Sequence, residues 1–94
     1  MNIDVKHDLI DQKFYTVIEG KEAYLRYLTN DKAVMNMIKT YVPPELRGRR
    51  IADAVVLKAM EYARDNNLKI IPTCSFIQTF LIRHNEFKEL VINS

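Results

Sequence analysis

The pair Pro43-Pro44 restricts the fold of this chain more than any other feature, because it separates a β-rich segment from a helical one. Proline lacks a backbone N–H and holds the residue before it in an extended conformation, so no regular element runs through the pair. An apolar run precedes the prolines. After them, apolar residues recur at helical spacing from Ile51 to about Asp65, which predicts one long amphipathic helix.

The segment before the prolines contains stretches rich in β-branched, aromatic and other apolar residues, with turn residues between them. We expect an antiparallel β-meander of the strands Phe14–Ile18, Ala23–Leu28 and Val34–Val42, with turns at Glu19–Lys21 and Thr29–Lys32. We assign no element to Ile3–Asp11, where the pattern is short and mixed.

The segment after the long helix completes a strand–helix–strand unit. Asn66 and Asn67 can end the helix, and the short run Leu68–Ile71 predicts a fourth strand, which such a connection places parallel to the third. Ser75 and Asn85 are candidate caps of two further helices. The residues therefore predict one α+β domain, spanning 1–94, with a meander, a βαβ unit and a C-terminal helical segment.

Composition excludes several classes of protein. With 94 residues, 48% hydrophobic and 28% charged, the chain is typical of one small globular domain. A net charge of +2 is too mild to indicate a nucleic-acid-binding face. The single cysteine rules out an internal disulfide, and one Cys with two His at unrelated spacing does not predict a metal site. We find neither a signal-peptide pattern nor an apolar membrane span, and we expect a cytoplasmic protein.

A basic turn, Arg47-Gly48-Arg49-Arg50, lies where the long helix begins. The first N–H groups of a helix lack internal partners and carry the positive end of its dipole, so this turn is a candidate anion site. Ligands of such sheets bind beyond the carboxyl ends of strands, here near Tyr41-Val42 and Pro72–Cys74. The alternative is a solvated basic loop whose charges are compensated by Glu45 and Asp53.

The same turn resembles the acetyl-CoA signature of the GNAT N-acetyltransferases, written Q/R-x-x-G-x-G/A. Arg47 matches its first position and Ala52 its last, whereas Arg50 replaces the middle glycine. The wider context, in Tyr41–Gly48, Ile71–Ser75 and Arg83–Asn85, resembles the short, single-domain YjdJ-type branch of that superfamily. The resemblance covers nearly the whole chain and implies the acyl-CoA N-acyltransferase (GNAT) fold.

The resemblance implies acetyl-CoA as the cosubstrate. The pyrophosphate would be held by backbone N–H groups of the turn, and the pantetheine would lie along the end of the third strand. The implied cofactor-binding residues are Tyr41, Val42, Arg47, Gly48, Arg49, Arg50, Ile51 and Ala52. This branch lacks the extra helices that form a substrate pocket in longer members, so the acceptor amine is not readable.

Two residues are candidates for the proton transfers of acetyl transfer. In many members of the family a tyrosine after the fourth strand resembles the proton donor, but this chain has no tyrosine after Tyr62. Cys74 lies at the expected end of the sheet and could donate a proton or be acylated, or it could simply be a small core residue. His84 could be a base, or a surface histidine at the end of a helix.

Three functions fit the sequence to different degrees. The first is a small acetyl-CoA-dependent N-acetyltransferase that acts on an unidentified amine. The second is an acyl-CoA-binding module with little or no catalysis, which the substitution at Arg50 and the absent tyrosine favour. The third is a nucleic-acid-binding domain, against which the mild net charge argues.

Overall fold

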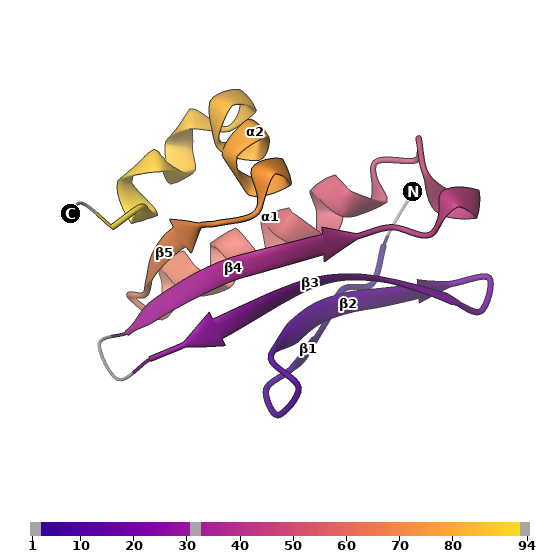
Figure 1. Ribbon diagram of the computed structural model, residues 1–94, viewed down its shortest axis with the longest axis horizontal. Helices are drawn as coiled ribbons and strands as arrows, with labels where there is room; N and C mark the ends of the chain where they lie inside the picture. The colour runs from indigo at the N-terminus through magenta and orange to yellow at the C-terminus, as the bar shows by residue number, and fades with distance from the viewer. Residues whose placement is uncertain (1–2, 31–32, 93–94) are drawn as a thin grey trace.

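The computed structural model describes residues 3–30 and 33–92 as a two-layer α+β domain (Figure 1). In chain order its elements are β1 (Lys6–Asp8), β2 (Lys13–Ile18), β3 (Lys21–Thr29), β4 (Val34–Tyr41), the 3₁₀ helix η1 (Pro44–Leu46), α1 (Ile51–Asp65), β5 (Lys69–Pro72), α2 (Ser75–Arg83) and the 3₁₀ helix η2 (Asn85–Leu90). Of the turn predicted at Thr29–Lys32, Asp31 and Lys32 lie outside the described residues.

The strands form one sheet in the order β1-β2-β3-β4-β5. The pairs from β1 to β4 are antiparallel, and β4 and β5 are parallel neighbours joined through α1 (Figure 1). The predicted meander and βαβ unit are therefore confirmed. Strand β1 was not predicted, because Lys6–Asp8 is short and polar and pairs with β2 only once that strand is in place.

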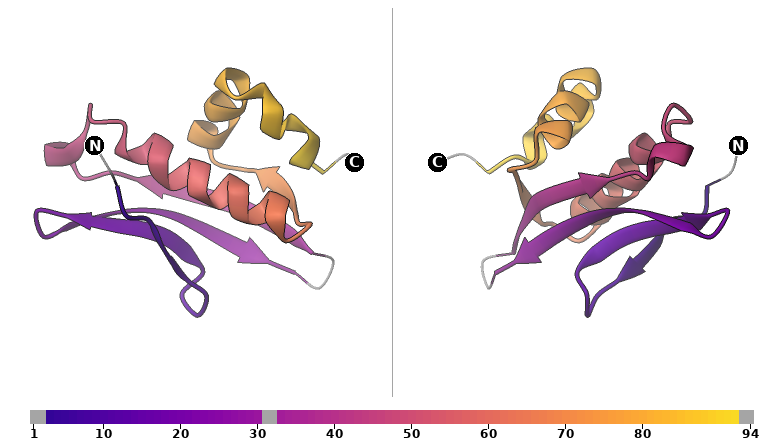
Figure 2. Two further views of the ribbon diagram at one scale, coloured as in Figure 1. Left: turned by 180° about the vertical axis from the view of Figure 1, so that it is seen from behind. Right: turned by 45° about the vertical axis from the view of Figure 1, so that its right-hand side comes forward.

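Both helices cover the same face of the sheet. The right-hand view of Figure 2 shows α1 and α2 above the strands. Helix α1 packs mainly over β2 and β3, whereas α2 packs over β4 and β5. One cluster of buried side chains joins the layers, and it includes Met35 and Met37 of the sheet with Val56, Met60 and Phe80 of the helices. In the described part of the chain, no helix is long and apolar enough to cross a membrane.

The predicted asparagine cap of α1 is confirmed, but the predicted caps of the later helices are wrong. Asn67 adopts a left-handed conformation (φ 57°), and the Leu68 N–H donates to the Ala63 carbonyl at 2.8 Å, which closes the last turn. Cys74 occupies the N-cap position of α2, so Ser75 is already helical. Asn85 is likewise the first residue of η2, which is 3₁₀ rather than α-helical.

Candidate functional site

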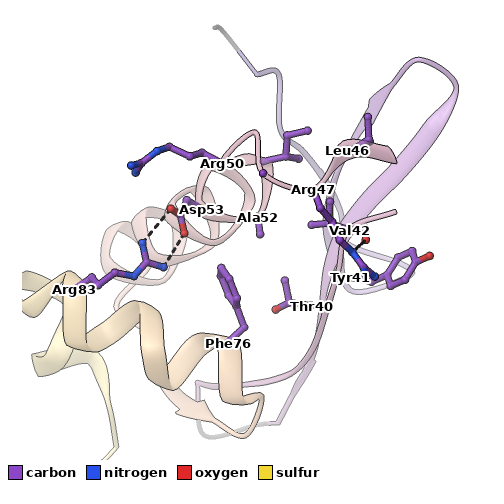
Figure 3. A pocket seen from close by; sticks show the side chains of 12 residues that line it. Thr40, Tyr41, Val42, Leu46, Arg47, Arg50, Ala52, Asp53, Phe76 and Arg83 are labelled. Carbon is purple, nitrogen blue, oxygen red and sulfur yellow. Dashed lines mark hydrogen bonds and ion pairs between the residues drawn. The ribbon is translucent and has the colours of Figure 1, made fainter. Parts of the chain in front are cut away.

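A cleft of about 450 Å³ opens where β4 and β5 separate (Figure 3). The two strands pair only as far as Met37 and Pro72, and the Cys74 N–H then donates to the Met37 carbonyl at 3.0 Å. Beyond that link, the end of β4, the start of α1 and one side of α2 enclose the space. Its lining residues are Thr40, Tyr41, Val42, Leu46, Arg47, Gly48, Arg50, Ile51, Ala52, Asp53, Phe76 and Arg83.

A β-bulge decides which side chains of β4 face this cleft. Arg26 pairs with Lys39 and Tyr27 with Met37, which leaves Ile38 as an extra residue. The extra residue reverses the alternation of faces, so Thr40 comes to the helix-covered side. Figure 3 shows Thr40 and Phe76 directed into the cleft.

Tyr41 consequently contributes less to the cleft interior than expected. Its ring points away from the cleft in Figure 3 and lies 5.6 Å from the ring of Tyr24, centroid to centroid. Tyr41 and the adjacent Val42 still line the cleft. The predicted end of the third strand therefore borders the site, although the tyrosine ring is directed elsewhere.

The basic turn presents unpaired backbone N–H groups to the cleft. Gly48 (φ 82°) and Arg50 (φ 59°) are both left-handed, and Arg50 occupies the N-cap position without a side-chain cap. No acceptor among the described residues takes the N–H groups of Ile51, Ala52 or Asp53. These donors and the helix dipole make this end of the cleft favourable for an anion.

A buried leucine fixes the position of the turn. Leu46, at the end of η1, is fully buried in a small cluster with Ala23 of β3 and Ile51 of α1. The Arg47 Nε donates to the Val42 carbonyl at 3.0 Å and ties the turn to the end of β4. The N-terminus of α1 is thus held rigidly against the strand whose end forms the opposite wall.

The arginines of the turn differ in their surroundings. Arg49 does not line the cleft, because its guanidinium donates to the Glu19 carboxylate at 3.1 Å. Arg50 lines the cleft, and its side chain makes no hydrogen bond or ion pair with any described residue. The sequence raised compensation of the turn by Glu45 and Asp53 as an alternative. Neither carboxylate forms an ion pair with an arginine of the turn, although the charge of Arg50 contributes to the lowered pKa of Asp53. Their carboxylates lie 3.8 Å from Lys21 Nζ and 2.9 Å from an Arg83 nitrogen, respectively.

Sequence reasoning missed the charged pair at the cleft wall. Two nitrogens of Arg83 donate to the two carboxylate oxygens of Asp53 at 3.1 and 2.9 Å. These hydrogen bonds hold the pKa of Asp53 below its ordinary value, against the opposing effect of burial. The two residues are 30 positions apart, so no local pattern indicated that they meet.

Cys74 lies beside the cleft but does not line it. It is half-buried, packs against the core, and its thiol lies 3.6 Å from the Thr40 hydroxyl. Burial raises the pKa of the thiol, but its hydrogen bond with the Thr40 hydroxyl and those from the backbone N–H groups of Phe76 and Ile77 outweigh burial, so the pKa lies below its ordinary value. A thiol at a helix N-terminus is typically acidified in this way.

His84 is not among the residues that line the cleft. Its ring stacks on Phe80 at 4.1 Å, and its Nδ1 lies 3.8 Å from a carboxylate oxygen of Glu86. The structure therefore brings Cys74 near the site and leaves His84 outside it. In residues 3–30 and 33–92, no three His, Cys, Asp or Glu side chains lie close enough together to hold a metal ion.

Comparison with known proteins identifies the family. Residues 13–90 match the family model described as GCN5-related N-acetyl-transferase. The chain belongs to this family. The GCN5-related fold is also found in the NMR solution structure of a GCN5-like protein from Staphylococcus aureus, which has a TM-score of 0.75 and 28% identity. That match covers 99% of this chain and 91% of the other.

Curated relatives are similar to this GCN5-related chain over most of their length. Protein NATD1 of Danio rerio is 30% identical over 93 residues, which cover 95% of this chain and 84% of that protein. Protein NATD1 of Homo sapiens is 31% identical over 81 residues, covering 84% and 72%, respectively. The family-model match over residues 13–90 includes β4, α1 and α2, which form the walls of the cleft.

Proposed function

We propose that this GCN5-related protein binds acetyl-CoA in the cleft and transfers the acetyl group to an amine. The observation that carries the proposal is the junction of two surfaces in one cleft. One end presents the unpaired N–H groups at the start of α1, and the other lies between Thr40 of β4 and Phe76 of α2. A polyphosphate suits the first surface and an extended pantetheine suits the second.

The turn would hold the pyrophosphate through the backbone from Gly48 to Ala52, with Arg50 as an adjacent cation. Arg47 would act indirectly, since it fastens the turn to Val42. The pantetheine would run past Tyr41 and Val42 toward Thr40. This orientation directs the thioester to the part of the cleft next to Cys74, whose thiol contacts Thr40.

The chemistry requires one bond to form and one to break. A neutral amine attacks the thioester carbonyl, the C–N bond forms, and the C–S bond breaks to release CoA as a thiolate. Cys74 would supply a proton to that sulfur, and the proton lost from the amine would return to Cys74 directly or through water. His84 has no part in this scheme, because its ring stacks on Phe80 and its Nδ1 faces Glu86, whereas the Cys74 thiol contacts Thr40 of the cleft lining. The proposal also places the protein in a reducing cytoplasm, where a free thiol persists.

A second function, acyl-CoA binding without efficient catalysis, is favoured by one observation. Cys74 is the residue to which the scheme gives the proton transfer, and it packs against the core. A packing role alone would account for that position. The two functions differ in a simple measurement. An enzyme releases free CoA from acetyl-CoA when a panel of primary amines is added, whereas a binding module shows saturable binding without amine-dependent release.

Titration with acetyl-CoA is the direct test of the site. We expect the largest amide chemical-shift changes at Gly48–Ala52, because the phosphates would accept hydrogen bonds from this backbone. Smaller changes should follow at Thr40–Val42. The measurement is a series of ¹H–¹⁵N spectra. Largest changes in the β2–β3 hairpin instead would place the ligand elsewhere.

Replacing Arg50 with glycine separates backbone shape from charge. Arg50 adopts the left-handed conformation that glycine adopts without strain, so the turn should keep its shape. We expect CoA affinity to fall severalfold and to depend less on salt, since one free cation leaves the phosphate end. The control is Arg49→Gln, which removes an arginine that is already paired with Glu19. Equal or tighter binding by Arg50→Gly would show that the side chain obstructs the site.

A further inference from the structure

The pair Asp53–Arg83 joins the two helices at the wall of the cleft (Figure 3). Asp53 is the third residue of α1, and Arg83 is the last residue of α2. The side chains are 23% and 43% exposed, so both can interact with a ligand in the cleft that they line.

The position of Asp53 creates an electrostatic conflict with a bound polyphosphate. Its carboxylate stands in the first turn of α1, beside the N–H groups that are unpaired. A negative side chain stabilises a free helix N-terminus, but it repels a second anion that docks there. Without compensation, the site would lose much of its preference for phosphate.

Arg83 is the cation that forms an ion pair with this carboxylate. Arg47 and Arg49 donate to Val42 and Glu19, respectively. The charge of Arg50 also acts on Asp53, but only Arg83 forms hydrogen bonds with its carboxylate. A guanidinium carries five N–H donors, and the contact with Asp53 engages only two nitrogens of the fork. No acceptor among the described residues takes the remaining donors, and Arg83 lines the cleft, so we expect them to be open to an oxygen of a ligand there.

We propose that Arg83 determines the specificity of the cleft for the pyrophosphate of CoA. It neutralises Asp53 at the start of α1 and adds a donor from α2 to the phosphate. This inference rests on the proposed function and extends it, because it assigns to α2 a role in cofactor recognition. The competing explanation is purely structural, with the ion pair acting only as a tie between the helices.

Four proteins and three ligands separate the two explanations. The proteins are the wild type, Arg83→Met, Asp53→Asn and the double variant, each checked for folding by its amide spectrum and melting temperature. The ligands are CoA, dephospho-CoA, which keeps the pyrophosphate, and pantetheine, which has no phosphate. Dissociation constants come from chemical-shift titration, which also reports millimolar binding.

We expect Arg83→Met to weaken the binding of CoA and dephospho-CoA by roughly tenfold, because the carboxylate of Asp53 loses its ion-pair partner and repels the phosphates. Pantetheine binding should change less than about twofold, since it brings no charge to the site. Asp53→Asn should bind CoA at least as tightly as the wild type. The double variant should recover most of the loss, because the repelling carboxylate is gone.

Other patterns overturn the inference. Equal loss for all three ligands, or a double variant no better than Arg83→Met, would show a structural tie. A loss confined to CoA would assign Arg83 to the 3′-phosphate instead, and unchanged CoA binding would remove Arg83 from recognition. Failure of the wild type itself to bind CoA would overturn the proposed function as well, a result that differs from a defect seen only in the variants.

Discussion

Replacement of Gly48 with valine is expected to weaken CoA binding by roughly ten- to a hundredfold. The backbone at Gly48 is left-handed (φ 82°), a conformation that β-branched residues resist, so the turn would have to rearrange. Rearrangement would misdirect the N–H groups from Gly48 to Ala52. A hydrogen bond to a charged group contributes about 1.5–3 kcal/mol, so the loss of one such bond accounts for the expected change.

The chain supplies a matched control in Gly20. This residue has nearly the same backbone conformation (φ 76°), and a Cβ would meet nothing within 4 Å at either glycine. Gly20 lies in the β2–β3 turn and does not line the cleft. Valine at either site should therefore cost about 1–2 kcal/mol of stability through the same strain. Only Gly48→Val should affect CoA. Equal affinities in the two folded variants would contradict a backbone cradle.

Replacement of Cys74 with serine is expected to reduce acetyl transfer by roughly a hundredfold while CoA affinity changes little. A group that acts only in proton transfer contributes to the transition state and not to ground-state binding. Serine preserves the size of the side chain, but its hydroxyl is a much weaker acid than the thiol. The measurement pairs amine-dependent release of CoA with a binding titration of the same preparation.

Thiol chemistry gives an independent test of Cys74. Because its pKa is lowered, more thiolate exists at neutral pH than in an unstructured peptide, so alkylation by iodoacetamide should be faster than its half-burial alone predicts. Bound CoA should protect the thiol. As the proton donor is the thiol form, acetyl transfer should fall as the pH rises through the pKa of Cys74.

A different outcome would identify Cys74 as a packing residue. In that case the thiol is inert in the folded protein, bound CoA has no effect on it, and Cys74→Ser changes only the melting temperature. Its contacts with the core are sufficient for such a role. Catalysis would then depend on the positioning of the amine alone, or the protein would be the acyl-CoA-binding module considered above.

Local patterns in the sequence determined most of the fold. The two prolines stop β4, the apolar spacing from Ile51 to Asp65 sets α1, and the short run that ends at Pro72 forms β5. These features depend on neighbouring residues, so they are readable without the tertiary structure. The glycine turn at the start of α1 belongs to the same class. Positions 48 and 50 are both left-handed, a conformation that glycine adopts without cost at Gly48 and that strains the backbone at Arg50.

Contacts between distant residues were decided only by the tertiary structure. The bulge at Ile38 directs Thr40 into the cleft and the ring of Tyr41 away from it, and no glycine marks this bulge in the sequence. Arg49 pairs with Glu19, and Asp53 pairs with Arg83; in each pair the two residues are 30 positions apart in the sequence. A long, flexible charged side chain can reach many partners, and only the packing of β2, α1 and α2 determines which one lies within hydrogen-bonding distance.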